Sequence, residues 1–167
     1  FNTWTMCSML AEVLATVDTE TDLLILDRGV FDALMWLELQ FRRGQVTQEE
    51  KDIFSKFVTL DRWRRLIDLT FVVKVEPEVA MERENATRII PKQGSLMNTT
   101  ALAEINEVLD AVSGDFADNF TLREFETTNG KVIPNNARLV GMLLDAFESW
   151  ADQEILAVPR TKLMELS

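Results

Sequence analysis

The stretch that decides the fold is residues 23–36, LLILDRGVFDALMW. Four apolar residues lead directly into the pair Asp27-Arg28, and apolar residues at helical spacing follow. This order is typical of a buried parallel strand that delivers charged side chains to the edge of a sheet, where open α/β folds bind their ligands. We therefore predict a strand at residues 23–27 and a helix at residues 30–42.

An adjacent acid and arginine suit phosphate chemistry. The Asp27 carboxylate can serve a metal ion or accept a hydroxyl proton, and the Arg28 guanidinium can bind two phosphate oxygens at once. The alternative is a solvated strand end with a surface ion pair. Asp32 and Trp36 lie four and eight residues beyond Arg28, on the same face of the predicted helix. They either line an acceptor pocket, with Trp36 stacking on a base, or belong to the ordinary surface and core.

Composition excludes several classes of site. The chain has 167 residues, enough for one domain, and 47% are apolar, which is ordinary for a folded protein. It has no histidine and one cysteine, which excludes histidine-based triads, HExxH zinc sites and an internal disulfide. The single cysteine agrees with a reducing cytoplasm. No apolar run approaches the ~18 residues that span a bilayer, and no signal peptide is visible.

The formal net charge of −11 argues against two kinds of partner. A surface this acidic repels nucleic-acid backbones and anionic membranes, so we expect neither a nucleic-acid polymer nor a membrane. A small phosphorylated ligand remains compatible, because the basic residues are clustered. The two clusters are Arg62, Arg64 and Arg65, and Arg83, Arg88 and Lys92.

Apolar periodicity predicts strands that alternate with helices, the pattern of a parallel sheet covered by helices. The predicted strands are 23–27, 69–75 and 120–127. The predicted helices are 4–17, 30–42, 48–67, a short helix from Pro77, 100–112 and 137–150, with a loop at 85–97. The stretch EILAVPRTKL after Trp150 resembles a strand that starts something new, so residues 151–167 are set apart as a tail.

This order of motifs resembles the P-loop nucleoside and nucleotide kinases of the thymidylate kinase and deoxynucleoside kinase group, over roughly residues 4–150. The pair Asp27-Arg28 matches the acid-arginine pair that ends the third strand in those kinases. The segment PEVAMERENATR, residues 77–88, resembles the start of their lid, and GSLMNTTALAEINEVL, residues 94–109, resembles the descent from it. Thr127-Thr128 sits where the family runs from its last strand towards the adenine end of the nucleotide site.

The resemblance implies a three-layer α/β fold, a parallel sheet flanked by helices, with a core at residues 1–150 and a lid at about 83–97. It implies Mg²⁺ with ATP, and a catalytic or metal-binding role for Asp27. It implies that Arg28 holds the acceptor or its phosphate, and that lid arginines close over the transferring phosphate. The residues carried over for the lid and for the adenine end are Arg83, Arg88, Thr127 and Thr128. The alternatives are an ordinary helix pair for Arg83 and a loop cap for Arg88.

The sequence departs from the family in one respect. None of the six glycines fits G-x-x-x-x-G-K-[ST], the loop that cradles the triphosphate. The simplest account is a fragment that lacks the phosphate-loop strand, its helix and a second strand. In the family that first strand lies between those ending here at Asp27 and Val75, so its removal leaves two buried edges unpaired. We therefore predict a chain that is poorly stable alone or completed by another segment, for which the tail is the only internal candidate.

Two functional hypotheses follow. In the first, the intact protein is an ATP-dependent, Mg²⁺-using phosphotransferase acting on a nucleoside, a nucleoside monophosphate or a similar small acceptor. In the second, the chain is a non-catalytic kinase-like binding or regulatory module without a phosphate loop. A mostly helical scaffold without a site is a third, weaker option. Family members often form dimers, so a homodimer is compatible with the resemblance.

Overall fold

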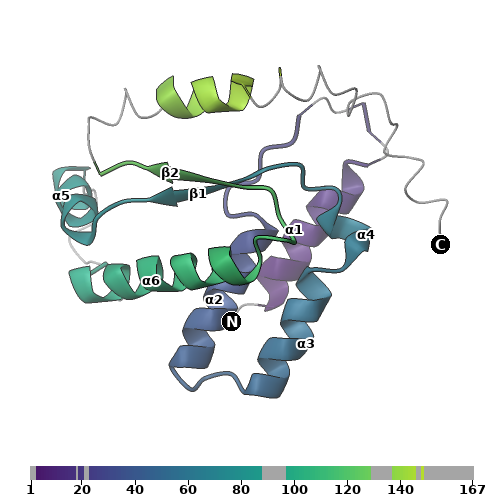
Figure 1. The fold of residues 1–167 in the computed structure, drawn as a ribbon, viewed down its shortest axis with the longest axis horizontal. Helices are drawn as coiled ribbons and strands as arrows, with labels where there is room; N and C mark the ends of the chain where they lie inside the picture. Colours follow the sequence, from purple (N-terminus) through teal and green to yellow (C-terminus); the bar gives the residue numbers. More distant parts are fainter. Residues whose placement is uncertain are drawn as a thin grey trace.

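The computed structural model describes residues 3–17, 19–20, 23–87, 97–128, 137–145 and 148. Its elements in chain order are α1 (Thr3–Ala15), α2 (Val30–Arg42), α3 (Gln48–Val58), α4 (Asp61–Arg64), β1 (Thr70–Lys74), α5 (Pro77–Thr87), α6 (Thr99–Asp115) and β2 (Leu122–Glu126). Residues 137–145 are also helical. The architecture is mixed α/β (Figure 1).

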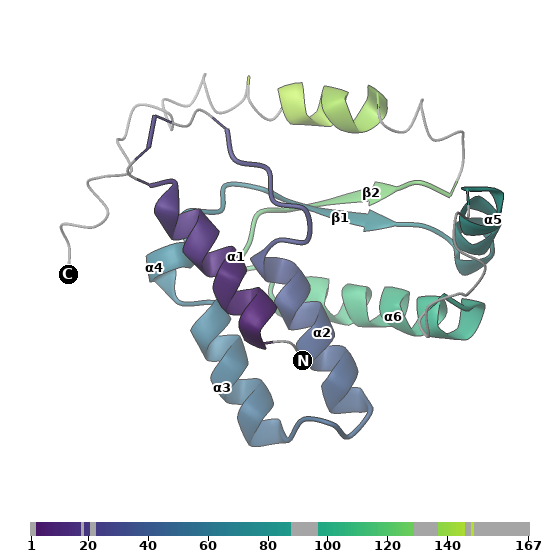
Figure 2. The same ribbon diagram turned by 180° about the vertical axis from the view of Figure 1, so that it is seen from behind.

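The sheet formed by the described residues has two parallel strands. β1 pairs with β2 in a register that runs from Thr70 opposite Leu122 to Lys74 opposite Glu126. Figures 1 and 2 show both strands pointing towards α5, with α2, α3 and α6 on one side of the pair and residues 137–145 on the other. The parallel arrangement agrees with the prediction, and both strands lie inside their predicted ranges.

The main core lies between the helices and the inner face of β1. Its members come from α1, α2, α3, α6 and β1, and include Met6, Leu34, Val58, Val72, Val108 and Val112, all at most 4% exposed. Phe31 at the start of α2 meets Phe120 just before β2, with ring centroids 5.5 Å apart and planes at 80°. This contact links the amino end of α2 to the amino end of β2.

The predicted helix at 48–67 is two helices in the structure. The capping box predicted at Thr47 and Glu50 is present: the Thr47 hydroxyl accepts the Glu50 N–H at 3.2 Å, and Glu50 accepts the Thr47 N–H at 2.8 Å. The helix ends at Val58 because Leu60 is non-helical, with ψ at 133°. The turn brings Trp63 back onto Phe57, at 4.7 Å between centroids, and buries its indole. Tertiary packing thus overrides helix propensity here.

Other helix boundaries shift by a few residues. α5 continues to Thr87, so the predicted loop at 85–97 is wrong for its first three residues, and residues 88–96 lie outside the described ranges. α6 runs from Thr99 to Asp115, because the Asn98 side chain caps it by accepting the Ala101 N–H at 2.9 Å. The tail at 151–167 also lies outside the described residues.

The predicted strand at 23–27 is wrong. Residues 23–26 have no regular structure, and Asp27 and Arg28 form a turn. A strand needs a hydrogen-bonded neighbour, and the part of the chain that the structure describes offers these residues none, since β1 pairs with β2 alone. Three apolar side chains remain outside the core: Leu23, Leu24 and Ile25 are 49%, 38% and 69% exposed. The run does not pair with β1, so the prediction that it needs a further partner stays open.

No described helix has the length and apolar character that crossing a bilayer requires.

Candidate functional site

Helices α1 and α2 lie side by side (Figures 1 and 2). Residues of both helices line a cavity of about 260 Å³. Three of the predicted site residues line it: Arg28 from the turn before α2, and Asp32 and Trp36 from α2 itself. The other lining residues are Thr5, Met6 and Met9 from α1 and Ala33 and Gln40 from α2. The spacing of Asp32 and Trp36 placed them on one helical face, and the structure brings that face to a cavity.

Arg28 is the strained residue of this site. Its φ of 60° is the only positive value outside glycine among the described residues. For an L-residue this conformation costs about 1–2 kcal/mol, and such strain tends to persist at functional sites. The side chain is exposed, and no salt bridge between described residues involves it. The Arg28 guanidinium therefore borders the cavity without a salt bridge to another described residue, although its charge acts on the nearby Asp32.

Asp32 and Trp36 form a hydrogen-bonded pair one helical turn apart. The Trp36 indole donates from Nε1 to Oδ2 of Asp32 at 2.8 Å. Burial raises the pKa of Asp32, with a smaller contribution from the charge of Asp27, while Arg28 and the indole hydrogen bond act against the rise. The pair fixes the indole plane and leaves Asp32 with further acceptor capacity next to the cavity.

Asp27 lies beside this cavity without lining it. Its side chain is exposed in the turn. No group of three or more potential metal ligands gathers within the described ranges, at Asp27 or elsewhere. Magnesium is often held by one or two carboxylates together with substrate phosphates, so a lone acid is compatible with that role. The metal remains a prediction.

The predicted lid and adenine-end residues meet at the carboxyl ends of the strands. Arg83 of α5 donates from Nη2 to the Thr127 carbonyl at 2.5 Å and from Nη1 to its hydroxyl oxygen at 3.3 Å. The Thr127 hydroxyl in turn donates to the Lys74 carbonyl at 3.0 Å. Thr128 accepts the Glu76 N–H at 2.9 Å. Arg83 and Thr127 thus tie α5 to both strands, and neither lines the cavity that Arg28 borders.

Arg88 falls outside the described residues, as does most of the predicted lid. The structure therefore brings Arg28, Asp32 and Trp36 together at one place and Arg83, Thr127 and Thr128 at another. Sequence reasoning did not identify the other five lining residues, Thr5, Met6, Met9, Ala33 and Gln40, as part of a site. Gln40 continues the spacing of four that joins Asp32 to Trp36, and this was the signal that could have identified it.

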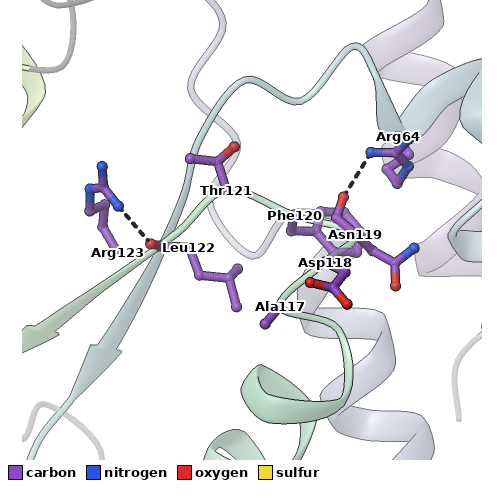
Figure 3. Close-up of a pocket in the computed structure, with 8 residues that line it drawn as sticks. All are labelled: Arg64, Ala117, Asp118, Asn119, Phe120, Thr121, Leu122 and Arg123. Atoms are coloured by element: carbon purple, nitrogen blue, oxygen red, sulfur yellow. Dashed lines mark hydrogen bonds between the residues drawn. The ribbon is translucent and has the colours of Figure 1, made fainter.

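A second, shallower hollow of about 430 Å³ lies between α4 and the segment that leads into β2 (Figure 3). Arg64 points into it and donates from Nη1 to the Asn119 carbonyl at 3.0 Å, while also pairing with Asp61 at 2.5 Å. The hollow sits at the amino end of β2, and its arginine is already engaged with Asn119 and Asp61. Arg28 forms no salt bridge with another described residue, so we take the cavity between α1 and α2 as the candidate site.

Comparison of the chain with family models, with curated proteins and with solved structures found no match. The kinase resemblance therefore stays a prediction from the sequence.

Proposed function

We propose that this chain binds a small phosphorylated ligand in the cavity between α1 and α2, and that the intact protein is an ATP-dependent phosphotransferase for which this cavity is the acceptor site. The observation that carries the proposal is the exposed Arg28 guanidinium, which forms no salt bridge with another described residue and lines a cavity together with Trp36 and Asp32. Arginine binds phosphate through two parallel charge-assisted hydrogen bonds. In a chain with a net charge of −11, an exposed arginine that forms no salt bridge with the described carboxylates is a local attraction for an anion.

The lining supports a ligand with two chemically different ends. Trp36, Met6 and Met9 offer aromatic and polarizable surfaces that suit a flat ring. The volume of about 260 Å³ is slightly below the range for drug-sized ligands, which favours a small ligand. Arg28 lines the cavity and is exposed, so it can contact a charged group of that ligand.

Phosphoryl transfer relies mainly on positioning and on neutralising the charge that develops at the transferring group. Arg28 would bind the acceptor and neutralise negative charge on it. Asp27, the preceding residue, would accept the proton of the attacking hydroxyl or bind Mg²⁺. No glycine of the sequence belongs to a phosphate-loop motif. Transfer is accordingly proposed for the intact protein, and ligand binding for the chain described here.

Titration calorimetry with a nucleoside 5′-monophosphate and with the matching nucleoside tests the binding step. We expect Arg28→Ala to weaken binding of the monophosphate by at least tenfold and to leave binding of the nucleoside unchanged. Arg62→Ala is the matched control, because it removes an equal charge from an exposed residue of α4 that does not line the cavity. Wild-type affinity in Arg28→Ala, or an equal loss in Arg62→Ala, would contradict the proposal.

The second candidate is a non-catalytic binding module, which the missing phosphate-loop motif favours. The two candidates differ in turnover. An extended protein that carries the upstream segment should form phosphorylated product from Mg·ATP and the bound acceptor if the first is right. Ligand binding sensitive to Arg28, without any product, would favour the second.

A further inference from the structure

We propose that the cavity between α1 and α2 takes up a proton from solvent, on Asp32, when it binds the anionic group of its ligand. Affinity for an anionic ligand therefore rises as the pH falls, and the pH regulates occupancy of the site. This inference rests on the proposed function and concerns the regulation of the same cavity.

The charged lining of the cavity consists of one guanidinium and one carboxylate. Arg28 and Asp32 both line it, and Arg28 is exposed whereas Asp32 is partly buried. Thr5 and Gln40 also line it, and they can hydrogen-bond a ligand but do not titrate. An anion that enters the cavity is therefore attracted by Arg28 and repelled by the ionised form of Asp32.

The elements packed around α2 bring no further charge to Asp32 within the described ranges. Arg28 and Asp27, in the turn before α2, are the charged residues that act on it. The single charged residue of α1, Glu12, is exposed and does not line the cavity. The ion pairs that α3 and α6 form with α2 and its carboxyl-terminal cap are Lys51–Glu38 and Glu104–Arg43. The state of Asp32 is thus set by its burial, by the turn and by what occupies the cavity.

A bound anion changes the balance of these influences on Asp32. Burial raises the pKa of Asp32, whereas the positive charge of Arg28 and the hydrogen bond from Trp36 lower it. An anion on the guanidinium offsets the charge of Arg28, and a ligand in the cavity adds to the burial. Both changes disfavour the ionised carboxylate, so the pKa of Asp32 rises further on binding. A group whose pKa rises on binding takes up protons, and affinity increases as the pH falls between the two pKa values.

The carboxylate has an oxygen available for this proton. The Trp36 indole donates to Oδ2 at 2.8 Å, and Oδ1 accepts no hydrogen bond from another described residue. A proton on Oδ1 leaves the indole hydrogen bond in place and turns Oδ1 into a donor. An oxygen of the bound anion can accept from this donor. Protonation thus removes a repulsion and adds a hydrogen-bond donor to the same cavity.

Calorimetry on the full 167-residue chain with uridine 5′-sulfate and with uridine tests this inference. The sulfate ester keeps one negative charge over the range tested, whereas a phosphate monoester itself titrates near pH 6. We expect the ester to bind about threefold to tenfold more tightly at about pH 5.5 than at about pH 7.5, the effect of one charge contact at a partly exposed site. Uridine, which brings no charge, should show a smaller change. Titrations in two buffers of different ionisation enthalpy should show net proton uptake with the ester.

Asp32→Asn retains an oxygen for the Trp36 indole but cannot take up the proton, so it should abolish both the pH dependence and the proton uptake. Glu38→Gln is the matched control, because it makes the same acid-to-amide change on α2 at a residue that does not line the cavity. It should keep the wild-type pH dependence.

Three results would overturn this inference: pH-independent binding of the ester to the wild type, proton uptake that persists in Asp32→Asn, or no binding of the ester. In each case, binding of uridine 5′-monophosphate that depends on Arg28 would leave the proposed function standing. Failure of both the ester and the monophosphate to bind would overturn both.

Discussion

The contact between Phe31 and Phe120 anchors the helix that bears the site, and its strength can be measured. Both rings are 5% exposed and meet edge to face, at 5.5 Å between centroids and 80° between planes. Such pairs contribute about 0.5–1.5 kcal/mol beyond their buried area. Phe→Leu nearly conserves volume and should cost about 1 kcal/mol at either position from packing alone, plus this pair energy. We therefore expect the double variant to lose less stability than the two single variants summed, by the pair energy.

Urea denaturation followed by far-UV circular dichroism on wild type, Phe31→Leu, Phe120→Leu and the double variant yields this coupling. The four m-values must agree, because a changed m-value signals a change in the unfolded or native ensemble instead. If the stability losses of the two single variants add up to the loss of the double variant within about 0.3 kcal/mol, the two rings do not stabilise each other. In that case α2 would be held by its aliphatic core contacts alone, and the argument from the aromatic pair would be refuted.

Two further predictions concern a titrating group and a helix cap. Burial raises the pKa of Asp32 in the folded protein. The protonated side chain therefore stabilises the folded state below the unfolded pKa of 3.8, and this stabilisation is lost as the pH rises through the folded pKa. Asp32→Asn should therefore gain stability relative to wild type between about pH 4 and pH 7 in urea titrations, and a relative loss would mean that Arg28 outweighs burial. Thr47→Ala removes the capping box of α3 and should cost about 1 kcal/mol, seen as a melting temperature lower by about 2–4 °C, while Thr47→Ser retains it. An unchanged melting temperature in Thr47→Ala would show that the cap adds nothing to stability.

The local features of the site were predictable from the sequence because they depend on helical spacing. Arg28, Asp32 and Trp36 were expected on one face, and the structure places all three at one cavity. The opposite wall was missed because the contact between α1 and α2 is tertiary. Periodicity showed that α1 is amphipathic and gave no information on which helix its apolar face meets.

The strands also show that a sequence pattern does not reveal the tertiary partner of a segment. The strand that contains β1 was predicted from its apolar run and the one that contains β2 from its alternation, and residues 23–27 have an apolar run as well. A strand forms only where two segments pair through hydrogen bonds. β1 and β2 pair with each other, whereas residues 23–26 have no pairing partner among the described residues. Arg83 is a further example, since the family resemblance made it a lid candidate, and nothing in the sequence indicated its hydrogen bonds to Thr127 in the structure.

The exposed run of Leu23, Leu24 and Ile25 has a consequence for how this chain behaves at high concentration. Apolar extended segments and open sheet edges are templates on which other chains assemble into cross-β aggregates. Here the apolar run is exposed in the folded state, so self-association does not have to wait for global unfolding. The net charge of −11 opposes it by repulsion, and salt screens that repulsion. Ionic strength, more than temperature, should therefore set the concentration at which the purified chain stays monomeric.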